Sequence, residues 1–275
     1  METAEEIRVN VSDYILTPLS CSYLIHEILK GLIYQKCQIP YPFSWLKSTI
    51  NRRRGEESEA ECEGLDLKPK TNINFTVEHH YRVASKFFDD FQNAMKEISQ
   101  ELSQNVVSEI LILFGPTPVC PKEVCRIKVP LLASGHFEDS HINDALKHQH
   151  KALRQIFLSN IWMDSVDSAI PCTNTYIFIK RGDISDNMKY FKPCKPLSFH
   201  NNVKVYCINL KWECTRDQTC CKNLVVYNEI PDTNIENSIE PVESKQHEHL
   251  WFQFAHHLQG FKNCFINKTA VCELW

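Results

Sequence analysis

Cysteine and histidine are the residues of this sequence with the greatest capacity for metal binding and nucleophilic chemistry. The chain contains 13 cysteines and 12 histidines. The densest cysteine group has 6, 5 and 0 residues between its successive members, Cys207, Cys214, Cys220 and Cys221. Structural zinc sites usually pair cysteines roughly two to four residues apart, so we expect these thiols to pack as small apolar side chains. A solvated or structural role is predicted for the late histidines, His247, His249, His256 and His257.

Motifs for enzymatic chemistry are missing or incomplete. The 7 glycines are isolated from one another, so no glycine-rich loop can bring backbone N–H groups onto a phosphate. His26-Glu27 opens like a metalloprotease helix, but Lys30 stands where the second histidine ligand would be. We therefore predict no catalytic residue, no metal site and no cofactor. A cysteine nucleophile remains the alternative, and it would require one thiol with a lowered pKa.

Composition and charge exclude several classes of protein. The 275 residues include 30 basic and 34 acidic side chains, for a net charge of −4, so no global basic field marks a nucleic-acid-binding protein. The N-terminus Met-Glu-Thr-Ala-Glu-Glu is acidic, whereas a secretory signal begins with positive charge. No apolar run approaches the roughly 18 residues that span a membrane. We expect an intracellular protein without nucleic-acid or membrane partners.

Three long helices are predicted from apolar residues at helical periodicity. Thr17-Pro18 offers an N-cap followed by proline, so the first helix should begin there and stop before Pro40. The second should cover residues 76–103 and the third about 140–165. Residues 51–72 contain many charges and few apolar side chains, so a charged flexible loop is predicted there.

Strands are predicted where β-branched and aromatic residues concentrate. Ile7, Val9 and Val11 alternate with polar residues, which favours a short first strand. The run 110–114 is apolar at every position and should form a central strand that is buried on both faces. Further strands are expected at 124–132, 173–180, 203–210 and 224–227, before an acidic loop at 229–248. The sequence therefore predicts an α+β protein with three helices against one mixed or antiparallel sheet.

The third predicted helix has an outward-facing apolar surface. At about 100° per residue, its inward stripe centres near Gln149 and Ile156, which places Phe157 at the rim and Leu158 and Trp162 roughly opposite. Other elements could wrap this helix. Alternatively, an exposed apolar patch beside it would mark a protein interface.

Five segments agree, in order, with one known family. They are 27–42 with its Gln38-x-Pro40-x-Pro42 exit, 110–115 with 121–123 and 131–133, 153–157 through Met163-Asp164, Phe191-Lys192-Pro193, and Trp251-Phe252-Gln253 with Gly260-Phe261-Lys262. Together they resemble the comet protein family of HORMA-like spindle-checkpoint silencers, which bind the mitotic arrest deficient protein two.

The resemblance implies a fold and a domain organisation. One HORMA-like domain would cover residues 1–275, with helices backing the sheet and a C-terminal safety-belt-like segment folding across it. Residues 251–261 would fill the chain's own peptide groove. The apolar residues after Lys262, among them Phe265, Val271 and Trp275, favour an ordered tail.

The resemblance also implies a function without enzymatic activity. Members dock onto the closed form of the checkpoint protein and block its self-dimerisation face. Phe157 of the third helix and Gln35 of the first are the matching contact positions, and we place Tyr34, Arg154, Leu158 and Ile161 beside them. Another HORMA-type module that captures a partner peptide is the alternative, and its groove would be empty in the isolated chain.

A second partner is implied in the same way. Family members present the closed checkpoint protein to an AAA+ remodelling ATPase of the pachytene checkpoint type, which disassembles the mitotic checkpoint complex. The ATPase-facing positions here are Phe191, Lys192, Pro193 and Lys195, although Cys194 replaces a basic residue of the family pattern. A monomer in the nucleus and cytoplasm is expected, with spindle or kinetochore association in mitosis.

Overall fold

The computed structural model describes residues 5–11, 16–62, 72–133, 142–167, 170–182, 190–200, 202–212 and 250–275. Its helices are α1 (Pro18–Gln35), α2 (Phe43–Cys62), α3 (Asn72–Gln104), α4 (Ile142–Phe157) and α5 (Asn160–Asp167), followed by the 3-10 helix η2 (Val271–Leu274). Its strands are β1 (Glu5–Asn10), β2 (Val107–Gly115), β3 (Glu123–Lys128), β4 (Asn174–Arg181), β5 (Phe191–Cys194), β6 (Lys204–Lys211), β7 (Leu250–Phe254), β8 (Leu258–Gln259), β9 (Phe265–Ile266) and β10 (Thr269–Ala270).

One mixed sheet organises the fold and confirms the α+β prediction. Its strands follow the order β1-β6-β3-β2-β4-β7-β5, and β8 also pairs with β4. Both β1 and β3 pair with β6 in parallel, whereas β2 pairs antiparallel with β3 and β4. The predicted central strand is β2, in which Ile112 lies opposite Cys125 on one side and Ile177 on the other.

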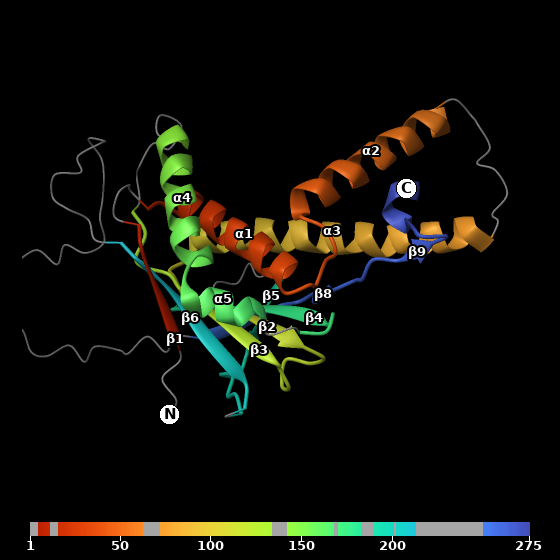
Figure 1. The fold of residues 1–275 in the computed structure, drawn as a ribbon. Coiled ribbons are helices and arrows are strands. Elements are labelled where there is room, and N and C mark those ends of the chain that lie inside the picture. Colours follow the sequence, from red (N-terminus) through yellow and green to blue (C-terminus); the bar gives the residue numbers. More distant parts are fainter. Residues whose placement is uncertain are drawn as a thin grey trace, which may run out of the picture.

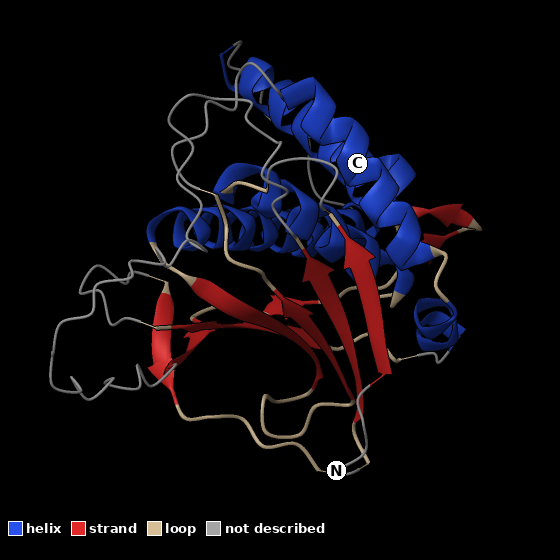
Figure 2. Ribbon diagram, turned by 90° about the vertical axis from the view of Figure 1, so that its left-hand side faces the viewer, coloured by secondary structure: helices blue, strands red, loops and turns tan. Residues whose placement is uncertain are grey.

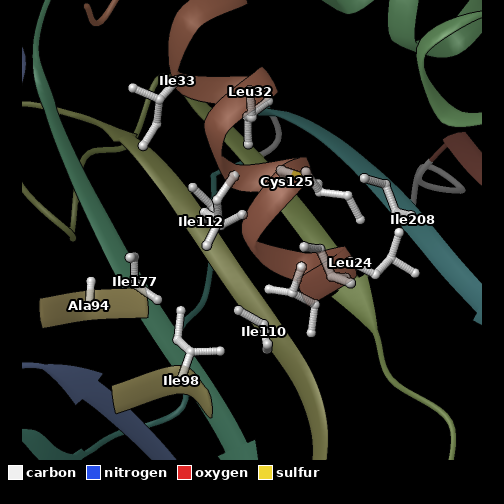
Figure 3. Packing of buried hydrophobic residues seen from close by; sticks show 14 of the residues in the cluster. Leu24, Leu32, Ile33, Ala94, Ile98, Ile110, Ile112, Cys125, Ile177 and Ile208 are labelled. Atoms are coloured by element: carbon white, nitrogen blue, oxygen red, sulfur yellow. The ribbon is translucent and has the colours of Figure 1, made fainter. Parts of the chain in front are cut away.

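The helices cover one face of the sheet (Figure 2). Figure 3 shows Leu24 and Leu32 of α1 above the sheet that carries Ile112 and Ile208, and Ile98 of α3 beside Ile177. These side chains belong to one cluster that is almost fully buried. Burial of this apolar surface is the main force that holds the helices on the sheet.

A smaller apolar cluster lies on the other face of the sheet. Leu111 and Leu113 alternate with the residues of β2 that face the helices, and both are fully buried. Leu197 and Phe199, from the segment between β5 and β6, pack against this cluster. Because β2 is covered on both faces, its sequence is continuously apolar rather than alternating.

The predicted start of α1 is confirmed by its cap. Thr17 and Ser20 form a reciprocal capping box, in which the Thr17 hydroxyl accepts the Ser20 N–H at 3.2 Å and the Ser20 hydroxyl accepts the Thr17 N–H at 2.9 Å. Pro18 occupies the first turn, where its missing N–H has no helical partner to lose. The helix ends at Gln35, and Cys37 then adopts a left-handed φ of 54°.

His26 of the incomplete metalloprotease motif is a structural residue that links α1 to α3. Its Nε2 donates to the Met95 carbonyl at 2.9 Å, and burial lowers its pKa from 6.5 to about 4. The His26 imidazole therefore binds a proton below pH 6.5 in the unfolded chain but only below about pH 4 in the folded chain. We expect the free energy of unfolding to lose about 3 kcal/mol through this group as pH falls from 6.5 to 4.

Urea unfolding at several pH values checks this expectation. His26→Gln keeps a donor but cannot titrate, so the variant should lose that part of the pH dependence. An unchanged pH dependence in His26→Gln would contradict the role of His26.

The predicted charged loop at 51–72 is wrong for residues 51–62, which continue α2. Charge there stabilises a helix, because Arg53 pairs with Glu57 one turn later at 2.8 Å and with Glu78 of α3 at 2.5 Å. The Arg53 guanidinium also lies 3.8 Å from the centre of the Tyr81 ring. Residues 63–71 lie outside the described residues.

Other predicted boundaries also need correction. The third helix is not continuous, because the chain turns at Leu158-Ser159 and starts α5. With α2 and α5 added, the described part of the chain has five α-helices where three were predicted. Ser159 caps α5, since its hydroxyl accepts the Trp162 N–H at 3.2 Å. The strand predicted at 124–132 ends at Lys128. The strand predicted at 224–227 and the acidic loop at 229–248 lie outside the described residues.

The C-terminal segment joins the sheet and then returns to the helices. Strand β7 pairs antiparallel with both β4 and β5. After β8 the chain runs toward the α2 end of the molecule (Figure 1). There the Trp275 ring lies 5.3 Å from His80 and 5.7 Å from Tyr81 of α3, so the expected order of the tail is confirmed.

Candidate functional site

The predicted contact residues meet at one corner of the molecule. Tyr34 and Gln35 end α1, Arg154 and Phe157 lie in the last turn of α4, and the turn that follows leads into α5. Figure 1 shows α4 descending beside α1 to meet α5. We call this the α1–α4–α5 corner and define it by its predicted members: Tyr34, Gln35, Arg154, Phe157, Leu158 and Ile161.

Phe157 is half-buried and is seated on α1. A Cβ atom built on Gly31 would lie 2.6 Å from Cζ of the Phe157 ring, so the ring edge occupies the space that a side chain would need. The same ring packs against Trp162 with centroids 5.0 Å apart. Phe157 therefore has one side within the protein and one side open to the surface.

Gln35 is engaged within the chain by an interaction that the sequence did not indicate. Its Oε1 accepts the Trp162 Nε1–H at 2.5 Å. Trp162 is fully buried and packs edge-on against Tyr206, so the prediction that it points outward is wrong. The missed signal was Ser159, whose capping preference marks a new helix start and rotates the following residues inward.

A buried ion pair lies directly behind the corner. Lys36 Nζ is 2.5 Å from Glu123 Oε1, and neither side chain is more than 3% exposed. Lys36 also donates to the Ser165 carbonyl of α5. Burial is the largest influence on both groups, so it lowers the pKa of Lys36 and raises that of Glu123. This pair joins the end of α1 to β3 and α5.

The outer surface of the corner presents exposed apolar groups beside one charged residue. Leu158 is 66% exposed and Tyr34 is 41% exposed, while Ile161 packs partly against the core. Arg154 is exposed at the edge of this surface. An open pocket of about 610 Å³ borders it, with Tyr34 and Gln35 in its lining. Clustered exposed apolar groups beside a hollow are typical of a protein interface.

The second predicted surface lies on strand β5, at the edge of the sheet. Lys192, Pro193 and Lys195 are exposed, and an edge strand tolerates the missing N–H of proline. Phe191 is only 1% exposed and packs 5.5 Å from Phe254. Its side chain therefore faces the core, and the prediction that it contacts an ATPase needs correction.

Neither a metal cluster nor an activated thiol is indicated among the described residues. They contain no cluster of histidine, cysteine or acid able to hold a metal ion, and of the densest cysteine group only Cys207 is among them. Among the described cysteines whose pKa shift is resolved, every shift is upward and results first from burial, as at Cys21, where the pKa rises to about 12. A catalytic thiolate requires the opposite direction. Over the same residues, no helix has the length and apolar content to cross a membrane.

Comparison with known proteins places this geometry in context. The model of a family described as "p31comet: Mad1 and Cdc20-bound-Mad2 binding" matches residues 14–222, which is more than half of the chain. The human MAD2L1-binding protein is 24% identical over 173 residues. That alignment covers 63% of this chain and 58% of the human protein, so the chain spans less than two thirds of this relative's length. The match to the family includes α1, α4 and α5.

Proposed function

The chain belongs to the p31comet family, and from this membership we propose that it binds the closed conformer of Mad2, the mitotic arrest deficient protein two. The docking surface is the α1–α4–α5 corner. The observation that carries this proposal is that Leu158 and Tyr34 are exposed at the same corner as the half-buried ring of Phe157. A partly exposed aromatic ring on a surface with other exposed apolar groups is typical of an interface hot spot.

Gln35 takes a defined role in this proposal. Its Oε1 is committed to Trp162, so the amide NH₂ is the group that is available to donate across the interface. The contact with Trp162 also fixes the orientation of the amide. Docking at this corner would cover the Mad2 face that otherwise binds a second Mad2 molecule.

Competition at that face tests the proposal. Added chain should dissociate a preformed complex of open and closed Mad2, and size-exclusion chromatography would follow the released open form. A ternary assembly of the chain with both Mad2 molecules would contradict docking at the self-dimerisation face.

A HORMA-like fold is part of the same proposal. It is supported by the helices α1, α3 and α4, which pack together on one side of a mixed sheet. In this reading, β7 and β8 form the safety-belt-like segment and occupy the chain's own groove. Four residues of β7 already pair with β4, which weighs against the alternative of an empty groove that captures a foreign peptide.

We further propose that the chain is a monomeric, non-enzymatic adaptor that presents closed Mad2 to an AAA+ remodelling ATPase. Such an adaptor would raise the effective concentration of Mad2 at the motor and so silence the spindle checkpoint in the nucleus and cytoplasm. The exposed lysines Lys192 and Lys195 beside the edge strand β5 form the ATPase-facing surface. This surface and the α1–α4–α5 corner belong to different elements, so both partners could bind together.

Reversing the charge of the β5 lysines tests the ATPase-facing surface separately from Mad2 binding. Lys192→Glu and Lys195→Glu should slow ATP-dependent conversion of closed to open Mad2 by about tenfold together, since each removes a rim charge that attracts the partner. Mad2 binding should stay unchanged. Lys211→Glu, at an exposed position of β6, is the matched control. Equal conversion by the double variant and the control would contradict this assignment.

A further inference from the structure

Gly31 is a glycine inside a helix with no backbone requirement for glycine. It lies one turn before Gln35 in α1, and its φ is outside the left-handed region. Glycine in a helix interior is less favourable than alanine, because it loses more backbone freedom on folding. Its presence here is therefore explained by its surroundings rather than by its backbone.

The surroundings of Gly31 consist of one aromatic ring. A Cβ atom at this position would lie 2.6 Å from Cζ of Phe157 and 3.1 Å from its Cε1, whereas carbon atoms in contact are separated by about 3.5–4.0 Å. Any side chain at residue 31 must therefore displace the ring.

The ring has little room to move inward. Trp162 lies 5.0 Å away, centroid to centroid, and is fully buried. The Gln35 amide and the Tyr206 ring hold that indole in place. Gly31 therefore contacts the Phe157 ring, and Gln35, one turn later in α1, contacts the Trp162 ring. A displaced Phe157 ring would move outward, into the surface that contains Leu158 and Tyr34.

We propose that Gly31 is a positioning residue for the docking surface: its missing side chain makes the seat that holds Phe157 in its binding orientation. This inference rests on the proposed function, because the orientation of Phe157 matters only if the α1–α4–α5 corner binds a partner. According to this proposal, binding requires glycine at position 31 in addition to Gln35 and Phe157.

The Gly31→Ala variant tests this positioning role, and Gly55→Ala is its matched control. Gly55 lies in α2 with nothing within 4 Å of its added Cβ, so Gly55→Ala changes helix propensity alone. We expect Gly31→Ala to weaken binding to closed Mad2 by about tenfold or more, as partial loss of a hot-spot anchor would. The thermal stability of the Gly31→Ala variant should not fall in proportion to this loss of affinity, because alanine favours the helix more than glycine does. Gly55→Ala should leave affinity unchanged.

A rescue variant identifies the route of the effect. Leucine at 157 lacks the outer ring carbons that meet residue 31, so Gly31→Ala should change affinity little in the Phe157→Leu background. Without any partner, the NMR signal of the Trp162 indole N–H should shift in Gly31→Ala and stay in place in Gly55→Ala, because the Phe157 ring beside it has moved.

The two readouts separate this inference from the function on which it rests. If the unmodified chain binds closed Mad2 and Gly31→Ala binds equally well, the positioning role is overturned and the proposed function stands. If the unmodified chain binds no Mad2, the proposed function is overturned, and with it the role of Gly31 in docking, even where the indole signal shifts.

Discussion

Replacing Phe157 with alanine should weaken binding of the chain to closed Mad2 by about 30-fold or more. An aromatic hot-spot residue contributes at least about 2 kcal/mol to such an interface, and each 1.4 kcal/mol is roughly a tenfold change in affinity. The side chain is held ready by its seat on Gly31 and its contact with Trp162. Calorimetric titration of closed Mad2 with each variant measures the effect directly.

Two controls distinguish lost contacts from lost folding. Phe157 also packs against the core, so urea unfolding of Phe157→Ala must show that the variant remains folded at the titration temperature. Leu158→Ala and Phe75→Ala form a matched pair, because both side chains are 66% exposed but only Leu158 lies in the α1–α4–α5 corner. Leu158→Ala should weaken binding and Phe75→Ala should not. Full affinity in a folded Phe157→Ala variant would remove Phe157 from the interface.

Removing one partner of the buried Lys36–Glu123 pair should give the largest loss of stability. Glu123→Gln leaves the Lys36 ammonium without its counter-ion in a site where neither side chain is more than 3% exposed. Breaking a buried pair in this way costs about 3–5 kcal/mol, measured as the free energy of unfolding in urea.

The double variant Lys36→Met/Glu123→Leu tests the reason for that loss. It removes both charges, so no unpaired charge is buried and most of the stability should return. A double variant that is as unstable as Glu123→Gln would show that the polar contacts of Lys36 with α5, rather than the unpaired charge, dominate the cost. A loss below about 1 kcal/mol in Glu123→Gln would match an exposed pair instead.

The elements that could be predicted are those whose sequence pattern and burial agree. The capping box and apolar stripe of α1 set its start and its inward face, and the unbroken apolar run of β2 required a strand covered on both sides. Local patterns carry this information because the apolar stripe of α1 and the apolar residues of β2 all lie in the two buried clusters.

The misplaced elements are those decided by contacts from distant parts of the chain. Residues 51–62 have little apolar content, yet Arg53 of α2 is held by Glu78 of α3. In one continuous helix Trp162 would lie on the outer face. Because Ser159 starts a new helix, Trp162 faces inward instead. Helical periodicity places side chains correctly only along one helix axis, and the break between α4 and α5 changes that axis.

The candidate site could be predicted in part. Gln35 and Phe157 followed from the family resemblance, and the structure brings both to one corner. Their supporting residues could not be found in this way, because Gly31 and Trp162 act through packing and Lys36 through an ion pair with β3. Such contacts depend on how helices cross, which a helical wheel does not describe.

The most direct test of the central claim is a calorimetric titration of the purified chain against closed Mad2 and, separately, against open Mad2. We predict a 1:1 complex with the closed form and no measurable heat of binding with the open form. Equal affinity for both forms, or binding to neither, would contradict the proposal that this chain recognises the closed conformer.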